Sequence, residues 1–89
     1  MRNSIQRLSH SANYEVSHEY ETVWLTHQGA QLAVVGDFYG DPNVAIFDSE
    51  ERWCAIGGSG LIVYFIEEPF DDYEYEKQSA QYFEVGRKG

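Results

Sequence analysis

The sequence has little cysteine, little positive charge and no long apolar run. Its one cysteine, Cys54, excludes an internal disulfide and is typical of a protein in a reducing cytoplasm. The longest apolar run, residues 61–66, has six residues, whereas a membrane-spanning helix needs roughly 20. Residues 1–4 are polar and no apolar segment follows them, so we expect no secretory signal and a cytoplasmic location.

The scarcity of positive charge argues against two classes of partner. Six Lys and Arg residues stand against 15 Asp and Glu residues, which gives a net charge of -9. The imbalance is concentrated in residues 37–76, which carry eleven acidic side chains and one basic one. Nucleic acids and anionic membranes are bound through Lys and Arg, so we expect neither as a direct partner. Such an acidic surface either serves solubility alone or attracts a basic partner.

The length and composition predict one small domain. The chain has 89 residues, of which 43% are apolar and 16% aromatic. This is enough for a single packed core and too apolar for a disordered chain. We therefore expect residues 1–89 to form one domain. Residues 1–13 are polar and weakly periodic, and they form either a loose N-terminal arm or a poor first element.

Alternation of apolar and polar residues predicts β-strands along most of the chain. The expected strands are residues 14–20, 22–26, 31–35, 44–47, 52–56 and 61–66. Segments rich in Gly, Asp, Asn and Pro separate them, as expected for turns. Residues 61–66 are apolar throughout, which predicts a central strand covered on both faces.

The last quarter of the sequence is compatible with two structures. Pro69, followed by Asp71 and Asp72, is a suitable start for a short helix with acids at its positive end. Alternatively, residues 73–76 and 82–85 form a hairpin whose turn is residues 77–80. Aromatic and β-branched residues with a period of two favour the hairpin. About seven short strands predict an all-β fold, either an antiparallel β-sandwich or a small barrel.

No group of residues has the spacing of a known catalytic or metal site. The three histidines lack the short pairing common at zinc sites, so we expect no metal and no cofactor. Cys54 lies in an apolar strand, which predicts a buried core residue rather than a nucleophile. Residues 57–60 are rich in glycine but lack the Lys and the following helix of a phosphate-binding loop. We therefore expect no enzymatic activity.

The acidic segment at residues 67–76 is the most informative feature. It combines six carboxylates with three aromatic side chains in ten residues. Aromatic residues contribute much of the energy at protein interfaces, and carboxylates around them steer a basic partner. Equally, the tyrosines could pack inward while the acids face water. The candidate partner-binding residues are Asp37, Tyr39, Asp41, Asp48, Glu50, Glu51, Glu67, Glu68, Phe70, Asp71, Asp72, Tyr73, Glu74, Tyr75 and Glu76.

Two parts of the chain carry a resemblance to a known group of proteins. The first comprises residues 35–42 (VGDFYGDP), Trp53-Cys54 and residues 57–64 (GGSGLIVY). The second comprises Pro69-Phe70, Tyr73, Tyr75 and residues 81–87 (QYFEVGR). Together, over residues 35–87, they resemble small bacterial immunity proteins of polymorphic-toxin and contact-dependent inhibition systems. The resemblance implies a cytoplasmic protein that binds a cognate toxin C-terminal domain, often a basic nuclease, and blocks it.

Three hypotheses for the function follow. In the first, an immunity protein occludes a basic toxin domain through its acidic, aromatic surface. In the second, the chain is a structural or assembly subunit, which predicts a large exposed apolar patch and self-association. In the third and least favoured, it is a small hydrolase that uses Cys54, His18 or a pair of carboxylates.

Overall fold

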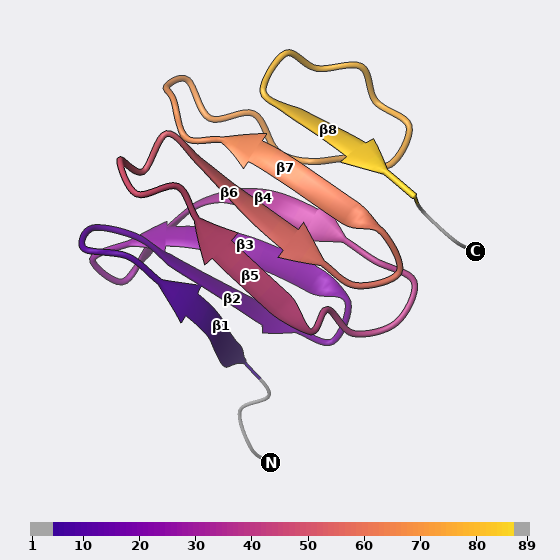
Figure 1. The fold of residues 1–89 in the computed structure, drawn as a ribbon, viewed down its shortest axis with the longest axis horizontal. Helices are drawn as coiled ribbons and strands as arrows, with labels where there is room; N and C mark the ends of the chain where they lie inside the picture. The colour runs from indigo at the N-terminus through magenta and orange to yellow at the C-terminus, as the bar shows by residue number, and fades with distance from the viewer. Residues whose placement is uncertain (1–4, 87–89) are drawn as a thin grey trace.

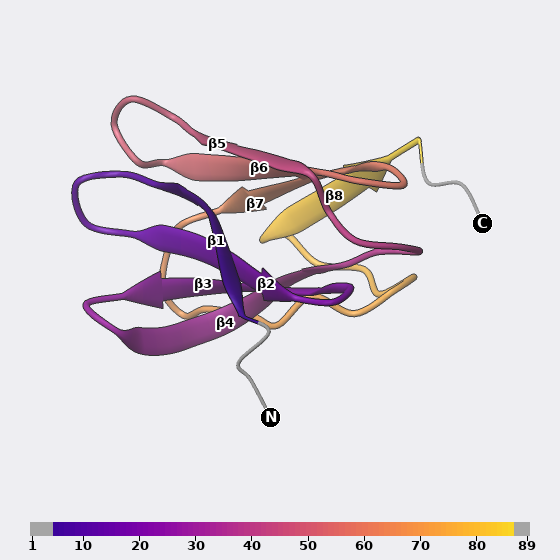
Figure 2. The same cartoon turned by 90° about the horizontal axis from the view of Figure 1, so that it is seen from below.

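The computed structural model describes residues 5–86, which form two four-stranded antiparallel sheets (Figure 1). The first sheet contains β1 (Gln6–His10), β2 (Glu15–Glu19), β3 (Thr22–His27) and β4 (Ala30–Asp37). The second contains β5 (Val44–Phe47), β6 (Trp53–Gly57), β7 (Leu61–Phe65) and β8 (Tyr82–Val85). In both sheets the strands are neighbours in chain order. Figure 2 shows the sheets as two layers, so the predicted all-β sandwich is confirmed, with eight strands rather than about seven.

The hairpin turns explain why consecutive strands pair. Gln28 and Gly29, between β3 and β4, both have positive φ, at 52° and 84°. Two such residues make the type I′ geometry, whose twist matches that of the flanking strands. Tyr20, in the turn between β2 and β3, also has positive φ, at 55°. These short turns leave antiparallel pairing as the only arrangement for the flanking strands.

The core lies between the two sheets and is built from alternate residues of each strand. Because side chains on a strand point to opposite faces in turn, each sheet supplies one apolar face to the interior. Tyr64 is the largest fully buried side chain, and its hydroxyl donates a hydrogen bond of 2.7 Å to the carbonyl oxygen of Asp71. The fully buried residues are Val16, Val23, Leu25, Val35, Cys54, Ile56, Ile62 and Tyr64.

Of the two alternatives expected for residues 1–13, the described residues form the weak first element and not the loose arm. β1 pairs with β2 along its length, with a bulge between Arg7 and Ser9, and it also contacts β5 of the second sheet. The pattern of β1 is weak because its side chains are mostly exposed or half-buried. Residues 1–4 lie outside the described residues.

The expectation that residues 61–66 are covered on both faces is also wrong. Ile62 and Tyr64 are fully buried, but Leu61 is 40% exposed, and Val63 and Phe65 are half-buried. β7 does lie between β6 and β8, as a central strand should. Its second apolar face points away from the sandwich, so the continuous apolar run reflects an apolar outer surface.

Residues 70–85 form neither the helix nor the complete hairpin. β8 pairs with β7, and residues 73–76 form no strand. Residues 66–81 instead form a long loop, here called the bridging loop. Its Tyr73 N–H donates to the carbonyl oxygen of Val34 at 2.8 Å, and the Val34 N–H donates to Oδ1 of Asp72 at 2.9 Å. The bridging loop thereby joins the second sheet to β4 of the first.

Candidate functional site

Cys54 and His18, the two residues named individually for the hydrolase hypothesis, lie inside the protein. Cys54 is fully buried, as predicted, and burial raises the pKa of its thiol to about 12. A thiol with such a pKa is almost entirely protonated at neutral pH and is a poor nucleophile. His18 is 7% exposed, and its Nδ1 lies 2.9 Å from the carbonyl oxygen of Tyr20. Within residues 5–86, no three His, Cys, Asp or Glu side chains are placed to hold a metal ion.

Three of the predicted partner-binding residues come together at one end of the sandwich. Asp37 ends β4, and Tyr39 and Asp41 lie in the loop that follows. This loop is fixed to the turn between β2 and β3: the Phe38 N–H donates to the carbonyl oxygen of Glu21 at 3.0 Å, and the Gly40 N–H donates to Oε2 of Glu21 at 2.8 Å. The Tyr39 N–H donates to Oγ of Ser59, in the loop between β6 and β7, at 3.0 Å.

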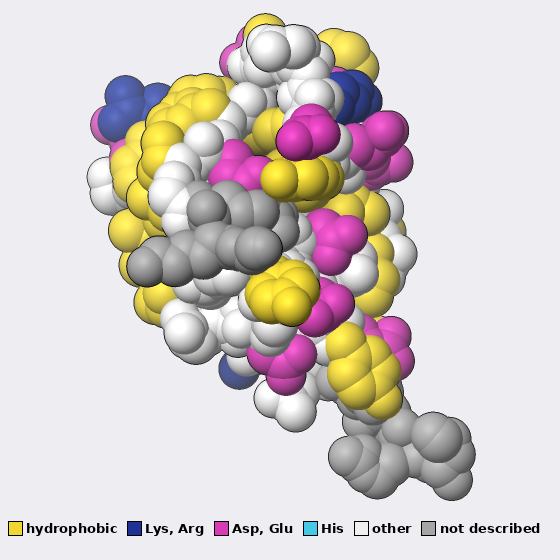
Figure 3. Space-filling model, turned by 90° about the vertical axis from the view of Figure 1, so that its right-hand side faces the viewer, with side chains coloured by type: hydrophobic (Ala, Val, Ile, Leu, Met, Phe, Trp, Pro, Cys, Tyr) yellow, Lys and Arg dark blue, Asp and Glu magenta, His cyan; other side chains and the backbone are white. Residues whose placement is uncertain are grey.

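Two aromatic side chains project from this end among carboxylates. Tyr39 is 72% exposed and Tyr20 is 65% exposed, while Phe38 between the loops is buried. Figure 3 shows acidic and hydrophobic side chains interleaved among the described residues on this side of the molecule, and the Lys and Arg side chains that it colours lie at the margins. We call this surface the loop end, and define it as Tyr20, Glu21, Asp37, Tyr39 and Asp41, all of which are exposed.

Sequence reasoning missed two residues of the loop end. Tyr20 continues the apolar alternation of its strand, so the pattern predicted an inward side chain. Glu21 lies outside residues 37–76, where the acidic residues are concentrated. The positive φ of Tyr20 turns its side chain out of that alternation. The available signal was the short gap between the expected strands 14–20 and 22–26. Such a gap leaves room only for a tight turn, and residues in a tight turn are usually exposed.

The outer face of the second sheet is a second exposed surface. The strand register aligns Val44, Gly57, Leu61 and Val85 in one row and Ile46, Ala55, Val63 and Phe83 in the next. Trp53 and Phe65 form a shorter third row. These ten residues, here called the outer face, include no charged side chain, and hydrophobic side chains run down the left-hand edge of Figure 3 where this sheet lies.

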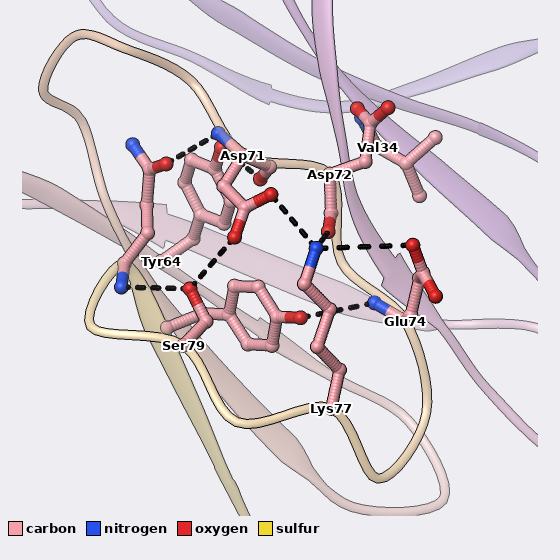
Figure 4. A network of polar contacts seen from close by, with 9 residues as sticks. Val34, Tyr64, Asp71, Asp72, Glu74, Lys77 and Ser79 are labelled. Carbon is pink, nitrogen blue, oxygen red and sulfur yellow. Dashed lines mark hydrogen bonds and ion pairs between the residues drawn. The ribbon is translucent and has the colours of Figure 1, made fainter.

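Two of the six carboxylates in the bridging loop, those of Asp71 and Asp72, hold the loop in place (Figure 4). Oδ1 of Asp71 accepts a hydrogen bond from Nζ of Lys77 at 2.8 Å, and its Oδ2 accepts one from Oγ of Ser79 at 3.0 Å. These two donors, the lysine first, hold the pKa of Asp71 below its usual value. Asp72 accepts the hydrogen bond from Val34 described above. Both acids therefore have partners within the fold.

The aromatic residues of the bridging loop are divided between core and surface. Tyr73 is 4% exposed, its hydroxyl donates to Oε1 of Glu84, and its ring lies 5.0 Å from that of Tyr82. Phe70 is half-buried against the core. Tyr75, by contrast, is 59% exposed. The remaining predicted residues of the loop, Glu67, Glu68, Glu74 and Glu76, are exposed, and Glu67 and Glu68 line an open hollow of about 300 Å³.

Two acidic residues of the turn between β5 and β6, Asp48 and Glu51, also accept hydrogen bonds within the protein. Oδ2 of Asp48 accepts hydrogen bonds from Nε of Arg52 at 2.6 Å and from the Arg52 N–H at 3.1 Å, and this arginine lowers the pKa of Asp48. Glu51 accepts hydrogen bonds from Oγ of Ser11, from the Asn13 N–H at 2.9 Å and from Nδ2 of Asn13 at 2.7 Å. Glu51 thus ties this turn to the one between β1 and β2.

We expect Glu51→Gln to weaken the pH dependence of stability. The hydrogen bonds from Ser11 and Asn13 favour the ionised carboxylate and lower its pKa from the usual 4.5. A carboxylate with a lowered pKa stabilises the fold above its unfolded-state pKa, and this stabilisation is lost as the pH falls through the folded-state pKa. The melting temperature of the wild type should therefore fall more steeply than that of Glu51→Gln between pH about 5 and about 3. Glu50→Gln makes the same change of charge at the exposed neighbouring residue, and an equal effect from it would contradict this role of Glu51.

Comparisons with known proteins add no relative. No family model, no curated protein and no solved structure matches this chain. Among the described residues, no helix is long and apolar enough to cross a bilayer. The two exposed surfaces are the features of the structure that bear on function, and the resemblance to immunity proteins stays a prediction.

Proposed function

We propose that this protein is an immunity protein, which uses the loop end to bind and block a basic toxin domain. One observation supports this most: two tyrosines that are 65% and 72% exposed stand among three exposed carboxylates on a surface fixed by backbone hydrogen bonds. Exposed tyrosines with adjacent carboxylates suit a partner whose surface is rich in Lys and Arg.

The mechanism of inhibition is steric and electrostatic. The two tyrosine rings bury apolar area in the complex at a low cost in side-chain entropy, because a tyrosine has few rotatable bonds. The carboxylates of Glu21, Asp37 and Asp41 attract Lys and Arg around a nuclease site, which raises the association rate. Hydrogen bonds from Tyr39 and Gly40 already fix the loop, so little backbone order is lost on binding. No bond is made or broken in the protein.

A second candidate function is that of an assembly subunit. The observation that favours it is the outer face, because a large exposed apolar surface is typical of a protein that is covered by another chain. The hydrolase hypothesis loses two of its candidate residues, since Cys54 and His18 are both buried in the sandwich.

The test of the proposed function is co-purification at low and high salt. We expect a tagged protein in its native host to retain one basic polypeptide in a one-to-one complex, and salt to weaken that complex by screening the charges. Tyr20→Ala combined with Tyr39→Ala should remove most of the binding, because each central aromatic residue of an interface contributes about 2 kcal/mol or more.

The matched control is Tyr75→Ala, which removes a tyrosine of similar exposure from the bridging loop. This variant should retain the partner as the wild type does. If the double variant held the same partner equally well, the loop end would not be the binding surface. If the wild type held no stoichiometric partner, the immunity function itself would be wrong.

A further inference from the structure

A hollow of about 300 Å³ opens between the end of β7 and the start of β8, and we call it the β7–β8 hollow. Its apolar lining residues are Phe65, Pro69 and Ala80, and its acidic ones are Glu67, Glu68 and Asp71. Pockets that hold small ligands have volumes of roughly 300–1,000 Å³. The β7–β8 hollow is therefore large enough for one long side chain of a partner and too small for a large cofactor.

The β7–β8 hollow lies at the end of the sandwich opposite the loop end. β7 begins at Leu61, next to the loop whose Ser59 accepts a hydrogen bond from the Tyr39 N–H. β7 ends at Phe65, which lines the hollow. A ligand in the hollow is therefore bound by a different surface from the one that we assign to the toxin domain.

Two carboxylates of the β7–β8 hollow have no partner in the fold. Asp71 is bound by Nζ of Lys77 and Oγ of Ser79, as Figure 4 shows. Within residues 5–86, in contrast, the side chains of Glu67 and Glu68 make no hydrogen bond and no ion pair. The described residues that line the hollow include no Lys, Arg or His. Two negative charges beside an apolar wall are thus left for a cation from outside the fold.

One wall of the β7–β8 hollow is fixed before anything binds. The Gln81 side chain donates to the carbonyl oxygens of Phe65 at 3.0 Å and Glu67 at 2.6 Å, and it accepts a hydrogen bond from the Asp71 N–H. These bonds hold the two sides of the hollow together, so little order has to be gained on binding. They also use the polar groups of Gln81, which leaves apolar and acidic groups to face a ligand.

The lining of the β7–β8 hollow determines the chemistry of its ligand. An anion is repelled by the carboxylates, and no three His, Cys, Asp or Glu side chains of the described residues are placed to hold a bare metal ion. A long cationic side chain fits, because its apolar stem covers an apolar wall while its charged end reaches a carboxylate. Arginine fits better than lysine, because its planar guanidinium stacks on an aromatic ring such as Phe65 and carries enough N–H groups for both Glu67 and Glu68.

We propose that the β7–β8 hollow binds an arginine side chain of a protein partner. The apolar stem of the arginine lies against Phe65, Pro69 and Ala80, and the guanidinium pairs with Glu67 and Glu68. The inference goes beyond the proposed function, because it concerns the other end of the sandwich and holds whether or not a toxin domain binds the loop end.

A titration followed by NMR tests this proposal without the partner. The probe is N-acetyl-arginine N-methylamide, in which two amides flank the arginine as they do in a protein. We expect saturable chemical-shift changes at the backbone N–H groups of residues 65–68 and 79–81. The dissociation constant should be about 1–10 mM, because an exposed ion pair with a small apolar contact is weak.

Three related compounds define the ligand. The citrulline analogue has the same shape without the charge, so it should cause no saturable change. The lysine analogue should bind at least about threefold more weakly, because an ammonium neither stacks nor forms a fork. Free arginine should also bind more weakly than the probe, since its own carboxylate is repelled by Glu67 and Glu68. This last comparison separates a side chain in a protein from the free amino acid.

Variants distinguish the β7–β8 hollow from the general attraction of an acidic chain. Glu67→Gln combined with Glu68→Gln should raise the dissociation constant at least about tenfold. The matched control, Glu74→Gln combined with Glu76→Gln, makes the same change of charge in the same loop outside the hollow. It should leave the dissociation constant within about twofold. Ala80→Trp fills the hollow without a change of charge, at an exposed residue, and should also weaken binding at least about tenfold.

Circular dichroism and urea unfolding establish that each variant is folded, and Ala80→Leu replaces Ala80→Trp if the latter does not fold. Equal weakening by the two double variants would overturn the proposal, because the net charge alone would then attract the probe. Shifts that do not saturate, or an equal response to the citrulline or lysine analogue, would also overturn it. So would binding that the substitution of Ala80 leaves unchanged. None of these results bears on the loop end, which the variants of Tyr20 and Tyr39 test.

Discussion

Replacing Tyr73 by alanine should lower the free energy of unfolding by about 3–5 kcal/mol, whereas replacing Tyr75 should change it by less than about 1 kcal/mol. The two residues are two positions apart in the same acidic segment, yet Tyr73 is 4% exposed and Tyr75 is 59% exposed. Loss of the Tyr73 ring removes its packing against Tyr82 and leaves a cavity between the bridging loop and the sheets. It also leaves Oε1 of Glu84 without the hydroxyl that binds it.

Urea unfolding of the wild type, Tyr73→Ala and Tyr75→Ala measures this difference. The dependence of the unfolding free energy on urea should have the same slope in all three, since the slope reports the surface exposed on unfolding. Tyr73→Phe separates packing from hydrogen bonding, because it keeps the ring and removes only the hydroxyl. We expect it to cost about 1 kcal/mol, the net value of an ordinary hydrogen bond. Equal effects from the alanine variants of Tyr73 and Tyr75 would mean that the bridging loop does not pack on the sheets as the structure has it.

The strands were predictable because their signal is local. Period-two alternation is a property of neighbouring residues, and it predicted β5 with its observed bounds and β3, β6 and β7 to within one residue at each end. Short turns rich in Gly and polar residues then implied antiparallel pairing of consecutive strands. The sandwich follows, since each sheet has one strongly apolar face to bury.

The bridging loop was not predictable, because the groups that fix it are far apart in the sequence. Val34 and Asp72 are separated by 38 residues, and Ser11 and Glu51 by 40. Sequence patterns identify a carboxylate but not the N–H or hydroxyl that it meets in the fold. Asp48, Glu51, Asp71 and Asp72 therefore resembled a free acidic surface, although each accepts hydrogen bonds within the protein.

The loop end was only half predictable for the same reason. Asp37, Tyr39 and Asp41 are close in sequence and share a turn-rich segment, so their exposure could be expected. Glu21 joins them through hydrogen bonds to residues 17 and 19 positions further along the chain. Binding surfaces assembled from several loops depend on such contacts, which only the folded structure reveals.

Replacing Gln81 by leucine should destabilise the protein by about 2–4 kcal/mol, although leucine is similar in size. Oε1 of Gln81 accepts a hydrogen bond from the Asp71 N–H, and its Nε2 donates to the carbonyl oxygens of Phe65 at 3.0 Å and Glu67 at 2.6 Å. The Gln81 side chain thus binds the backbone both at the start of the bridging loop, at Phe65 and Glu67, and further along it, at Asp71. Leucine leaves three backbone groups without their partners, and each costs about 1 kcal/mol or more where water does not replace it.

Gln78→Leu is the matched control, since Gln78 lies in the same loop and is exposed. It should change the free energy of unfolding by less than about 0.5 kcal/mol. Hydrogen exchange locates the effect: in Gln81→Leu, protection of the Tyr73 N–H, which binds Val34, should fall more than protection within β3. If exchange rose equally at both places, the loop and the sandwich would unfold as one unit. If neither stability nor exchange changed, water would satisfy the three backbone groups, and Gln81 would not be what closes the loop over β4.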